Sequence, residues 1–157
     1  MQAVDFNELS QKIIQILEKQ TAIILATSSN DKVTARVMSY VNEGFTIYFP
    51  AGDSSEKIQH IKINPNVACA VNNMQIEGTA IICGYYDENP HFIDLYKAKH
   101  PRYFEAYKIM GNELVIRVNA KRIKLWTYLD GIPCLNILDI ENNMAYQEMQ
   151  NYFNRHT

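Results

Sequence analysis

Residues 22–49, AIILATSSNDKVTARVMSYVNEGFTIYF, contain three apolar runs separated by two short polar stretches. The stretches Ser28–Asp31 and Asn42–Gly44 are rich in the residues that form tight turns. Between them, apolar and polar residues alternate, which is typical of a strand with one buried face. We therefore predict two successive hairpins of an antiparallel sheet, with strands at residues 22–28, 32–41 and 45–49, the last of them ended by Pro50.

Further strands are expected downstream, where apolar residues form short runs or alternate with polar ones. They lie at residues 67–71, 75–86, 113–119 and 122–129. Gly78 and Gly84 interrupt the second of these, and a glycine there marks a bulge, a bend or a close approach of another backbone or a ligand. A small closed or partly closed antiparallel barrel would bury strands of this number and length.

Helical periodicity appears around these strands. The first helix is expected to be capped by Asp5 or Asn7. Its apolar residues recur at three- and four-residue steps, which is typical of an amphipathic helix. A second helix is expected from Asp53 to Ile63, since Asp53 and Glu56 have the spacing of a capping box. The other expected helices are a pair broken at His100–Pro101 and a last helix at residues 141–153. The tyrosines 85, 86, 96, 103 and 107 are predicted to pack in a helical layer over the barrel.

The composition excludes several protein classes. The 157 residues, 47% hydrophobic and 20% charged, suit one domain spanning residues 1–157 and are atypical of a disordered chain. The net charge of −2 argues against nucleic-acid binding through an overall positive charge. Neither a basic, apolar leader nor a run of about 18 apolar residues is present, so we expect no membrane segment and a cytoplasmic location. Cys69, Cys83 and Cys134 lack metal-binding spacing, and we expect buried free thiols and no metal.

The sharpest candidate site is the start of the second helix. Ser54, Ser55 and Lys57 place two hydroxyls and a cation beside the unpaired amides of a helix N-terminus, which favours a bound anion. A cation in the first helical turn opposes the helix dipole, and a bound phosphate would reverse the sign of that interaction. The alternative is that the serines only cap the helix while Lys57 pairs with a nearby carboxylate.

Arg36 is the second candidate, because it lies within an apolar, alternating strand. A guanidinium there must find a partner or reach solvent at a sheet edge, since a buried unpaired charge costs several kcal/mol. If that strand lies near the second helix, Arg36 and Lys57 converge on one phosphate, with arginine as a bidentate fork and lysine as a point charge. This arrangement outlines a site for a nucleotide phosphate.

Four segments follow in order: TARVMS at 34–39, GFTIYF at 44–49, SEKIQHIKINPNVA at 55–68 and NMQIEGTA at 73–80. With these segments, residues 10–130 resemble the FMN-binding split-barrel proteins of the pyridoxamine 5'-phosphate oxidase-like family. The resemblance implies a mainly β (α+β) fold, namely a six-stranded antiparallel split β-barrel of Greek-key type with flanking helices. It also implies a homodimer with FMN in grooves between the subunits.

The same resemblance implies a set of cofactor-binding residues. Arg36, Ser55 and Lys57 match positions around the flavin phosphate, to which Ser54 is adjacent. The main chain of Val37, Met38 and Ser39 is expected to run along the flavin ring. The remaining matches are Phe49, Pro50 and Ala51 after the third strand, Gln75 approaching from the other subunit, and Trp126 at the border of the groove.

The chain also departs from the family pattern. The family often has a threonine at the position of Ala51, an arginine at that of Glu56 and, in the true oxidases, a lysine at that of Val41. Each change removes a hydrogen bond or a positive charge that would help to hold FMN. The true oxidases also carry an Arg-x-His substrate motif, of which Arg155-His156 at the extreme C-terminus is no convincing counterpart. Vitamin B6 oxidation is therefore not the preferred activity.

The leading hypothesis is an FMN-dependent oxidoreductase that acts on a small molecule. The flavin ring then carries the chemistry, and no protein acid–base pair is needed. The alternative is a non-enzymatic protein that stores or senses FMN, haem or another planar ligand in the same barrel. A third hypothesis, stacking of single-stranded nucleic acid on tyrosines, fits the acidic composition poorly, so no nucleic-acid partner is expected.

Overall fold

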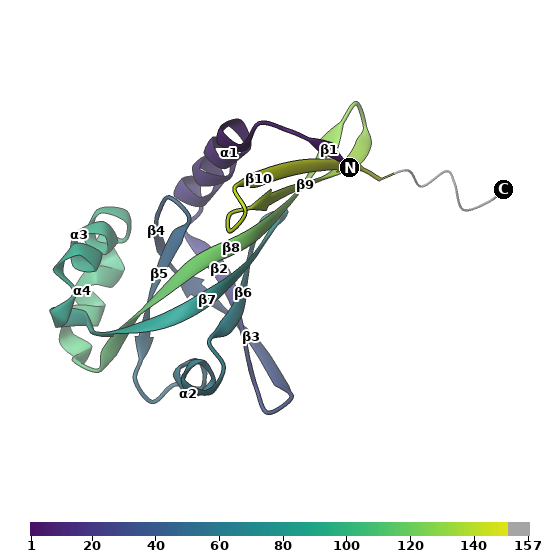
Figure 1. The fold of residues 1–157 in the computed structure, drawn as a ribbon. Coiled ribbons are helices and arrows are strands. Elements are labelled where there is room, and N and C mark those ends of the chain that lie inside the picture. The colour runs from purple at the N-terminus through teal and green to yellow at the C-terminus, as the bar shows by residue number, and fades with distance from the viewer. Residues whose placement is uncertain (151–157) are drawn as a thin grey trace.

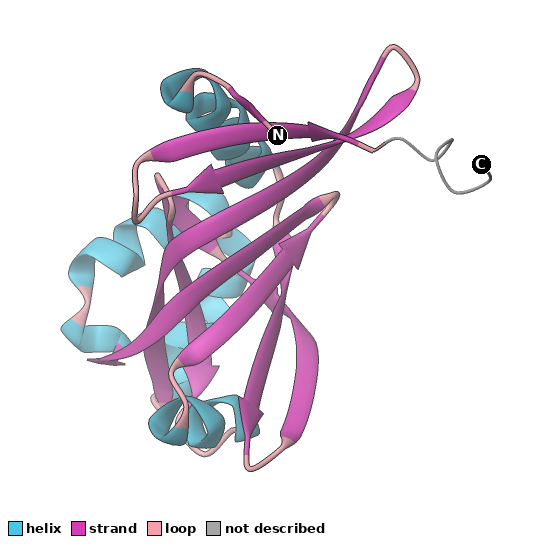
Figure 2. Ribbon diagram, turned by 45° about the vertical axis from the view of Figure 1, so that its right-hand side comes forward, coloured by secondary structure: helices cyan, strands magenta, loops and turns pink. Residues whose placement is uncertain are grey.

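The computed structural model describes residues 1–150, and at residues 107–110 it describes the backbone only. Figures 1 and 2 show a long, twisted sheet with helices packed around it. The strands are β1 (Gln2–Ala3), β2 (Ala22–Ser29), β3 (Lys32–Ser39), β4 (Val41–Glu43), β5 (Thr46–Gly52), β6 (Asn66–Val71), β7 (Met74–Tyr85), β8 (Glu113–Leu129), β9 (Ile132–Asp139) and β10 (Met144–Met149). The helices are α1 (Phe6–Lys19), α2 (Glu56–Ile63), the short 3-10 helix η1 (Tyr86–Glu88), α3 (Pro90–Lys99) and α4 (Pro101–Met110). None of these helices is long and apolar enough to cross a membrane.

Strand β8 joins the two parts of the sheet. Its first half pairs with β5 and its second half with β9, both antiparallel, while β7 pairs along the opposite edge. The order β3-β2-β6-β7-β8-β5 makes the split barrel, and β9, β10 and β1 continue the sheet beyond it. In residues 1–150 no ladder closes the barrel between β3 and β5. The predicted mainly β, antiparallel split barrel with flanking helices is confirmed.

A β-bulge marks the point at which the two halves of β8 meet. Glu77 pairs with Arg122 but Gly78 pairs with Ala120, so Lys121 has no opposite residue on β7. A Cβ atom on Gly78 would lie 2.7 Å from the backbone oxygen of Asn119, closer than two such atoms can approach. The structural role predicted for Gly78 is therefore confirmed.

Helices α1 and α2 cover the main core. Asp5 is the N-cap of α1, and its Oδ1 accepts a hydrogen bond from the amide of Glu8 at 2.7 Å. The buried residues of α1 recur at three- and four-residue steps, as amphipathic packing requires. The main core combines them with inward-facing residues of the strands, and its fully buried members include Ile13, Leu17, Ile23, Leu25, Phe49, Ile58, Ile76 and Ile123.

Helices α3 and α4 form a second, aromatic cluster beside β4 and β8. Both helices begin with a proline, where the missing amide costs no helical hydrogen bond. The cluster consists of Val41, Phe92, Tyr96, Phe104 and Val115, with Tyr48 and Tyr86 packed against it. The predicted aromatic layer is confirmed for Tyr86 and Tyr96, whereas Tyr85 and Tyr103 are exposed, and the side chain of Tyr107 lies outside the described residues.

The structure differs from the predicted secondary structure in β5, β8, β9 and β10. Residues 144–149 form β10 rather than a helix, because β9 offers a free edge and Ala145 enters the core opposite Leu138. Phe153, Arg155 and His156 lie outside the described residues. The separate strands expected at 113–119 and 122–129 are one strand, and β9 was not expected at all. Pro50 lies inside β5, where β8 is the one ladder partner, so the missing amide is tolerated.

The cysteines follow the prediction in part. All three are free thiols, and Cys69 and Cys134 are buried, but Cys83 is partly exposed. Burial raises the pKa of Cys69 to about 12, because the apolar core disfavours the thiolate. Cys69 is therefore a packing residue rather than a nucleophile.

We predict that Gly78→Ala destabilises the protein by about 1–3 kcal/mol, the usual range for forcing extra atoms into a packed site. The new Cβ would meet the backbone of Asn119 at the bulge. Urea unfolding measures the effect. The matched control is Gly52→Ala, because its Cβ would meet only the Glu113 Oε1 atom at 4.0 Å. Equal stability of the two variants would contradict the proposed strain at the bulge.

Candidate functional site

A cavity of about 330 Å³ lies between β3, β5 and the starts of α2 and β8. It brings together predicted residues from three separate segments of the chain. Its lining consists of Val37, Met38, Ser39, Pro50, Ala51, Gly52, Lys57 and Glu113. Gly52 and Glu113 were not predicted. They lie here because the β5–β8 ladder pairs Gly52 with Glu113.

Strand β3 lines the cavity with a free edge. β3 stands at one end of the strand order of the sheet, and β2 is its single ladder partner in the described part of the chain. Every second residue of an edge strand points its backbone amide and carbonyl away from the sheet. The main chain of Val37, Met38 and Ser39 therefore offers hydrogen-bonding groups to a planar ligand in the cavity.

Lys57 is the cation of this cavity. Burial lowers the pKa of its ammonium group, and the positive charge of Arg36 lowers it further, whereas Glu113 opposes both effects. Within residues 1–150, no carboxylate oxygen lies within 4 Å of the Lys57 ammonium. The alternative in which Lys57 pairs with a carboxylate is therefore not realised in this structure.

The Arg36 guanidinium is hydrogen-bonded to residues on the inner face of the barrel. Its Nη1 donates to the Thr27 hydroxyl at 2.8 Å and to the Leu25 carbonyl at 3.3 Å, and its Nη2 donates to the Thr34 hydroxyl. Its side chain is 21% exposed, and burial lowers the pKa of the guanidinium, although Glu56 opposes this. Arg36 and Lys57 lie close enough for their charges to interact, which the predicted convergence on one phosphate requires.

Glu56 takes the place at which the family often has an arginine. Its Oε2 accepts a hydrogen bond from the Lys32 ammonium at 2.8 Å, and its Oε1 lies 3.6 Å from Arg36 Nη2. The bond from Lys32 is the main cause of the lowered pKa of Glu56. The carboxylate thus offsets part of the positive charge that Arg36 would present to an anion.

Ser55 is the N-cap of α2, which begins at Glu56 and not at the predicted Asp53. The Ser55 hydroxyl makes no capping hydrogen bond, and its oxygen is buried without any partner in the described chain. An unsatisfied buried hydroxyl is costly, so a hydrogen-bonding group bound at this helix start would stabilise it. We call Arg36, Ser55 and Lys57 the cradle. Ser54, beside it, is exposed.

Six predicted residues do not line the cavity: Arg36, Ser54 and Ser55, described above, and Phe49, Gln75 and Trp126. Phe49 is fully buried in the main core. Gln75 is exposed on the outer face of the sheet, in one cross-strand row with Val37 through Ile24 and Ala70. Three strand spacings separate these two ends of the row, which is ~14 Å. Trp126 is 44% exposed and lies near Gln75, since its amide donates to the Asn73 carbonyl.

His60 is a buried histidine of α2. It lies one turn after Lys57 on α2, is 7% exposed, and places its Nδ1 2.9 Å from the Thr27 hydroxyl. Sequence reasoning could not separate a buried from an exposed histidine here, because the helix packs on β2 through a contact 33 residues away.

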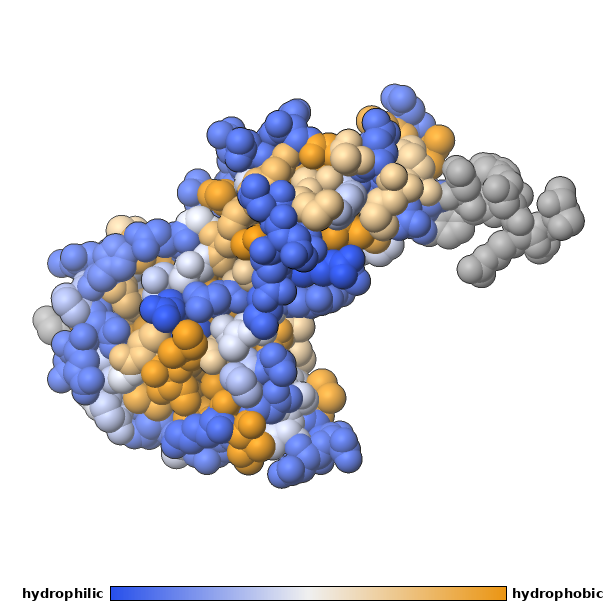
Figure 3. All heavy atoms as spheres, viewed as in Figure 1, coloured by the Kyte–Doolittle hydropathy of each residue, from blue (hydrophilic) through white to orange (hydrophobic). Residues whose placement is uncertain are grey.

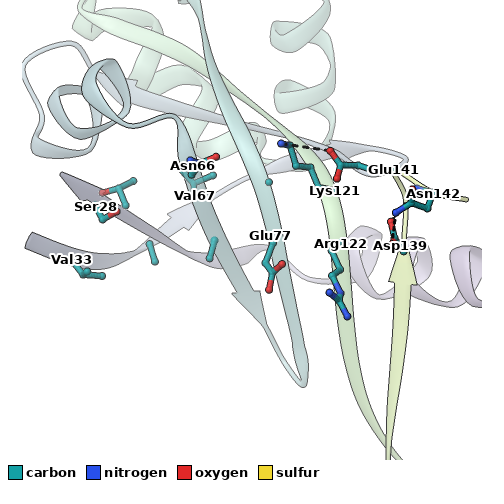
Figure 4. A pocket seen from close by; sticks show the side chains of 14 residues that line it. Ser28, Val33, Asn66, Val67, Glu77, Lys121, Arg122, Asp139, Glu141 and Asn142 are labelled. Carbon is teal, nitrogen blue, oxygen red and sulfur yellow. Dashed lines mark hydrogen bonds and ion pairs between the residues drawn. The ribbon is translucent and has the colours of Figure 1, made fainter. Parts of the chain in front are cut away.

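A larger cavity, of about 660 Å³, lies on the outer face of the sheet between β2 and β9 (Figure 4). Most of its charged residues have partners: Lys121 lies 3.6 Å from Glu141, Glu77 lies 3.8 Å from Lys124, and the Asn142 side chain donates to Asp139. Arg122 also lines this cavity, and its charge interacts with Asp139 without an ion pair within 4 Å in the described residues. No predicted site residue lines it. The smaller cavity is lined by predicted residues, including Lys57, and lies at the start of α2, where the Ser55 hydroxyl has no partner in the described residues, so it is the candidate cofactor site.

We predict that Glu113→Gln stabilises the protein at pH 7 relative to wild type and has a smaller effect at pH 4. Burial raises the pKa of the Glu113 carboxyl, although Lys57 opposes this. A raised folded-state pKa gives stability that is present at low pH and lost as the pH rises through it. Urea unfolding at both pH values measures this, with the exposed Glu8→Gln as control. An equal effect at both values would contradict the assignment.

Comparison with known proteins places the chain in a family. The sequence profile described as pyridoxamine 5'-phosphate oxidase matches residues 9–127. General stress protein 26 of Bacillus subtilis (strain 168) is 33% identical to this chain over 60 residues, which are 38% of this chain and 43% of the relative. The match thus spans less than half of that relative's length.

Two solved structures share the fold. HutZ, the heme storage protein of Vibrio cholerae, superposes with a TM-score of 0.63 at 10% identity, covering 74% of this chain and 94% of HutZ. A FAD-binding protein of Mesorhizobium loti superposes with a TM-score of 0.58 at 13% identity, covering 73% of this chain and 91% of the other. Since the family profile spans most of the split barrel, the chain belongs to the pyridoxamine 5'-phosphate oxidase family.

Proposed function

We propose that this protein binds FMN in the smaller cavity and is a flavin-dependent oxidoreductase with a small-molecule substrate. The proposal rests on two polar groups at the start of α2 that have no partner within residues 1–150. They are the Lys57 ammonium, which lines the cavity, and the buried Ser55 hydroxyl. Members of the family commonly bind flavins, and one protein of the same fold is a FAD-binding protein.

The residues of the site fit a flavin mononucleotide. A phosphate at the start of α2 would accept hydrogen bonds from the Ser55 hydroxyl and the first helical amides, and would be paired with Lys57. The free edge of β3 can bind the polar rim of a planar ring beside it. When bound, the flavin supplies electron or hydride transfer. The protein then orients the ring and excludes water from it.

The fit is weaker at two positions. Glu56 holds Lys32 and Arg36 internally, so a phosphate must compete with its carboxylate. Ala51 lines the cavity without a polar group where the family often has a threonine. We therefore expect FMN to be retained through Lys57, Ser55 and the backbone more than through Arg36.

We also propose that the site is completed by a second copy of the chain. The outer face of β2 and β3 is apolar and open: Val33 and Val37 are 71% and 70% exposed, and Ile24 is 43% exposed. Gln75 and Trp126 lie on this side of the sheet, out of reach of the cradle in their own subunit. Figure 3 shows the molecule hollowed between the β2–β3 hairpin and the β9–β10 end, which leaves room for a partner.

We predict that Lys57→Gln weakens FMN binding by about 10- to 100-fold, the range for losing a charge-assisted hydrogen bond. Fluorescence quenching of FMN titrated with flavin-free protein measures the affinity. Lys62→Gln, on the exposed face of the same helix, is the matched control and is expected to bind as wild type. Riboflavin, which lacks the phosphate, should bind both variants and wild type equally. A wild-type protein that binds no FMN would refute the proposal.

We predict that Ala68→Arg converts a dimer into monomers. Ala68 lies in the outer row Ala35-Ala26-Ala68, so a long cation there would obstruct a partner on that face without entering the core. Sedimentation velocity measures the mass, and Lys19→Arg on α1 serves as the control. A wild-type protein that sediments as a monomer at micromolar concentration would contradict the shared site.

Storage or sensing of a planar ligand is the second candidate, favoured by the fold shared with the heme storage protein HutZ. The histidines of the described chain do not support axial ligation from either cavity. His60 and His100 are buried, and His91 is bonded to Glu43 at the surface. Titration with haemin and FMN separates the two: a Soret shift with no FMN quenching would favour haem. Bleaching of bound FMN by reduced nicotinamide would favour the oxidoreductase.

A further inference from the structure

We propose that Thr27 and His60 are positioning residues that set the two cations of the cradle, and this rests on the proposed FMN site. Neither residue touches the cavity where the ligand is expected. Thr27 lies on the inner face of β2, 2% exposed, and His60 lies on α2. Together they connect Arg36 on β3 with the helix that carries Lys57.

The direction of the hydrogen bonds follows from donor chemistry. An arginine guanidinium can only donate, so the Thr27 oxygen must accept from Arg36 Nη1 at 2.8 Å. The other partner of the Thr27 hydroxyl within the described residues is His60 Nδ1, at 2.9 Å. We assign the hydroxyl as the donor in this bond, because the opposite direction would leave its buried proton without an acceptor. His60 Nδ1 therefore accepts, and the ring is the neutral tautomer protonated at Nε2.

This chain of bonds has a geometric consequence. His60 is one helical turn after Lys57, so the contact that orients Thr27 also sets the height of α2 over β2 and the position of the Lys57 ammonium. Arg36 is fixed at the other end of the same chain. A single buried relay thus sets the separation of the two cations before any ligand binds, which lowers the ordering cost of binding.

Two substitutions test the relay, and two conservative ones rescue it. Thr27→Val and His60→Leu each remove one hydrogen bond and are expected to weaken FMN binding about 3- to 10-fold. The double variant should lose no more than either single one, because both changes break the same chain. Thr27→Ser keeps the hydroxyl, and His60→Asn keeps an acceptor near Nδ1, so both should bind within about twofold of wild type. Circular dichroism confirms that each variant is folded.

A second measurement reads the relay without a ligand. In the flavin-free protein, the ¹⁵N chemical shifts of His60 should show Nδ1 unprotonated and Nε2 protonated, and Thr27→Val should broaden or shift the Arg36 guanidinium protons. Protonation at Nδ1, additive losses in the double variant, or wild-type affinity of Thr27→Val would each overturn the proposal. If wild-type protein binds no FMN, the proposed function fails, and the NMR signals alone decide the relay.

Discussion

The antiparallel pairing of β8 is the constraint on which the other features depend. One edge of this strand is shared between β5 and β9, and the opposite edge pairs with β7 between Leu114 and Leu125. A bulge at Gly78 allows the change of direction, because no side chain opposes the Asn119 backbone there. The same strand places Glu113 in the smaller cavity at its start and Trp126 on the outer face near its end. The barrel, the cavity and the open outer face are therefore consequences of one ladder.

The electrostatics of the cradle follow from how its charges are satisfied. The Arg36 guanidinium donates to two threonine hydroxyls and a carbonyl and lies near Glu56. These internal partners reduce the attraction that its charge can exert on a bound anion. Lys57 has no such partner, and burial together with Arg36 lowers its pKa. The balance suits a site that is ordered in advance and binds an anion through one lysine, a hydroxyl and helix amides. It is weaker than a site with three free cations, because a dianion meets carboxylates at Glu56 and Glu113.

Much of the fold could be predicted from local patterns. The β2–β3 hairpin, the cap at Asp5, the helix break at His100 and the glycine at the bulge each depend on residues close in sequence. The predictions that failed depend on distant partners. Residues 144–149 form a strand because β9 provides an edge, and Pro50 stays in β5 because β8 binds that strand from one side. The candidate cradle of Arg36, Ser55 and Lys57 could be proposed from the sequence, since each residue type has a chemistry that needs a partner.

The sequence alone determined most of the strand periodicity, the cap of α1 and the break between α3 and α4, and it indicated residues whose chemistry suits a phosphate, because these depend on spacing and side-chain chemistry. The tertiary structure decided which of them meet. It placed Glu113 and Gly52 in the cavity through contacts between segments far apart in the chain. In the same way it brought His60 and Arg36 to the same hydroxyl, that of Thr27. It also placed Gln75 on the outer face of the sheet, in one row with Val37, whereas the Arg36 side chain bonds to residues on the inner face. Pairing register is the physical reason, since a shift of one residue would turn every one of these side chains to the other face of its strand.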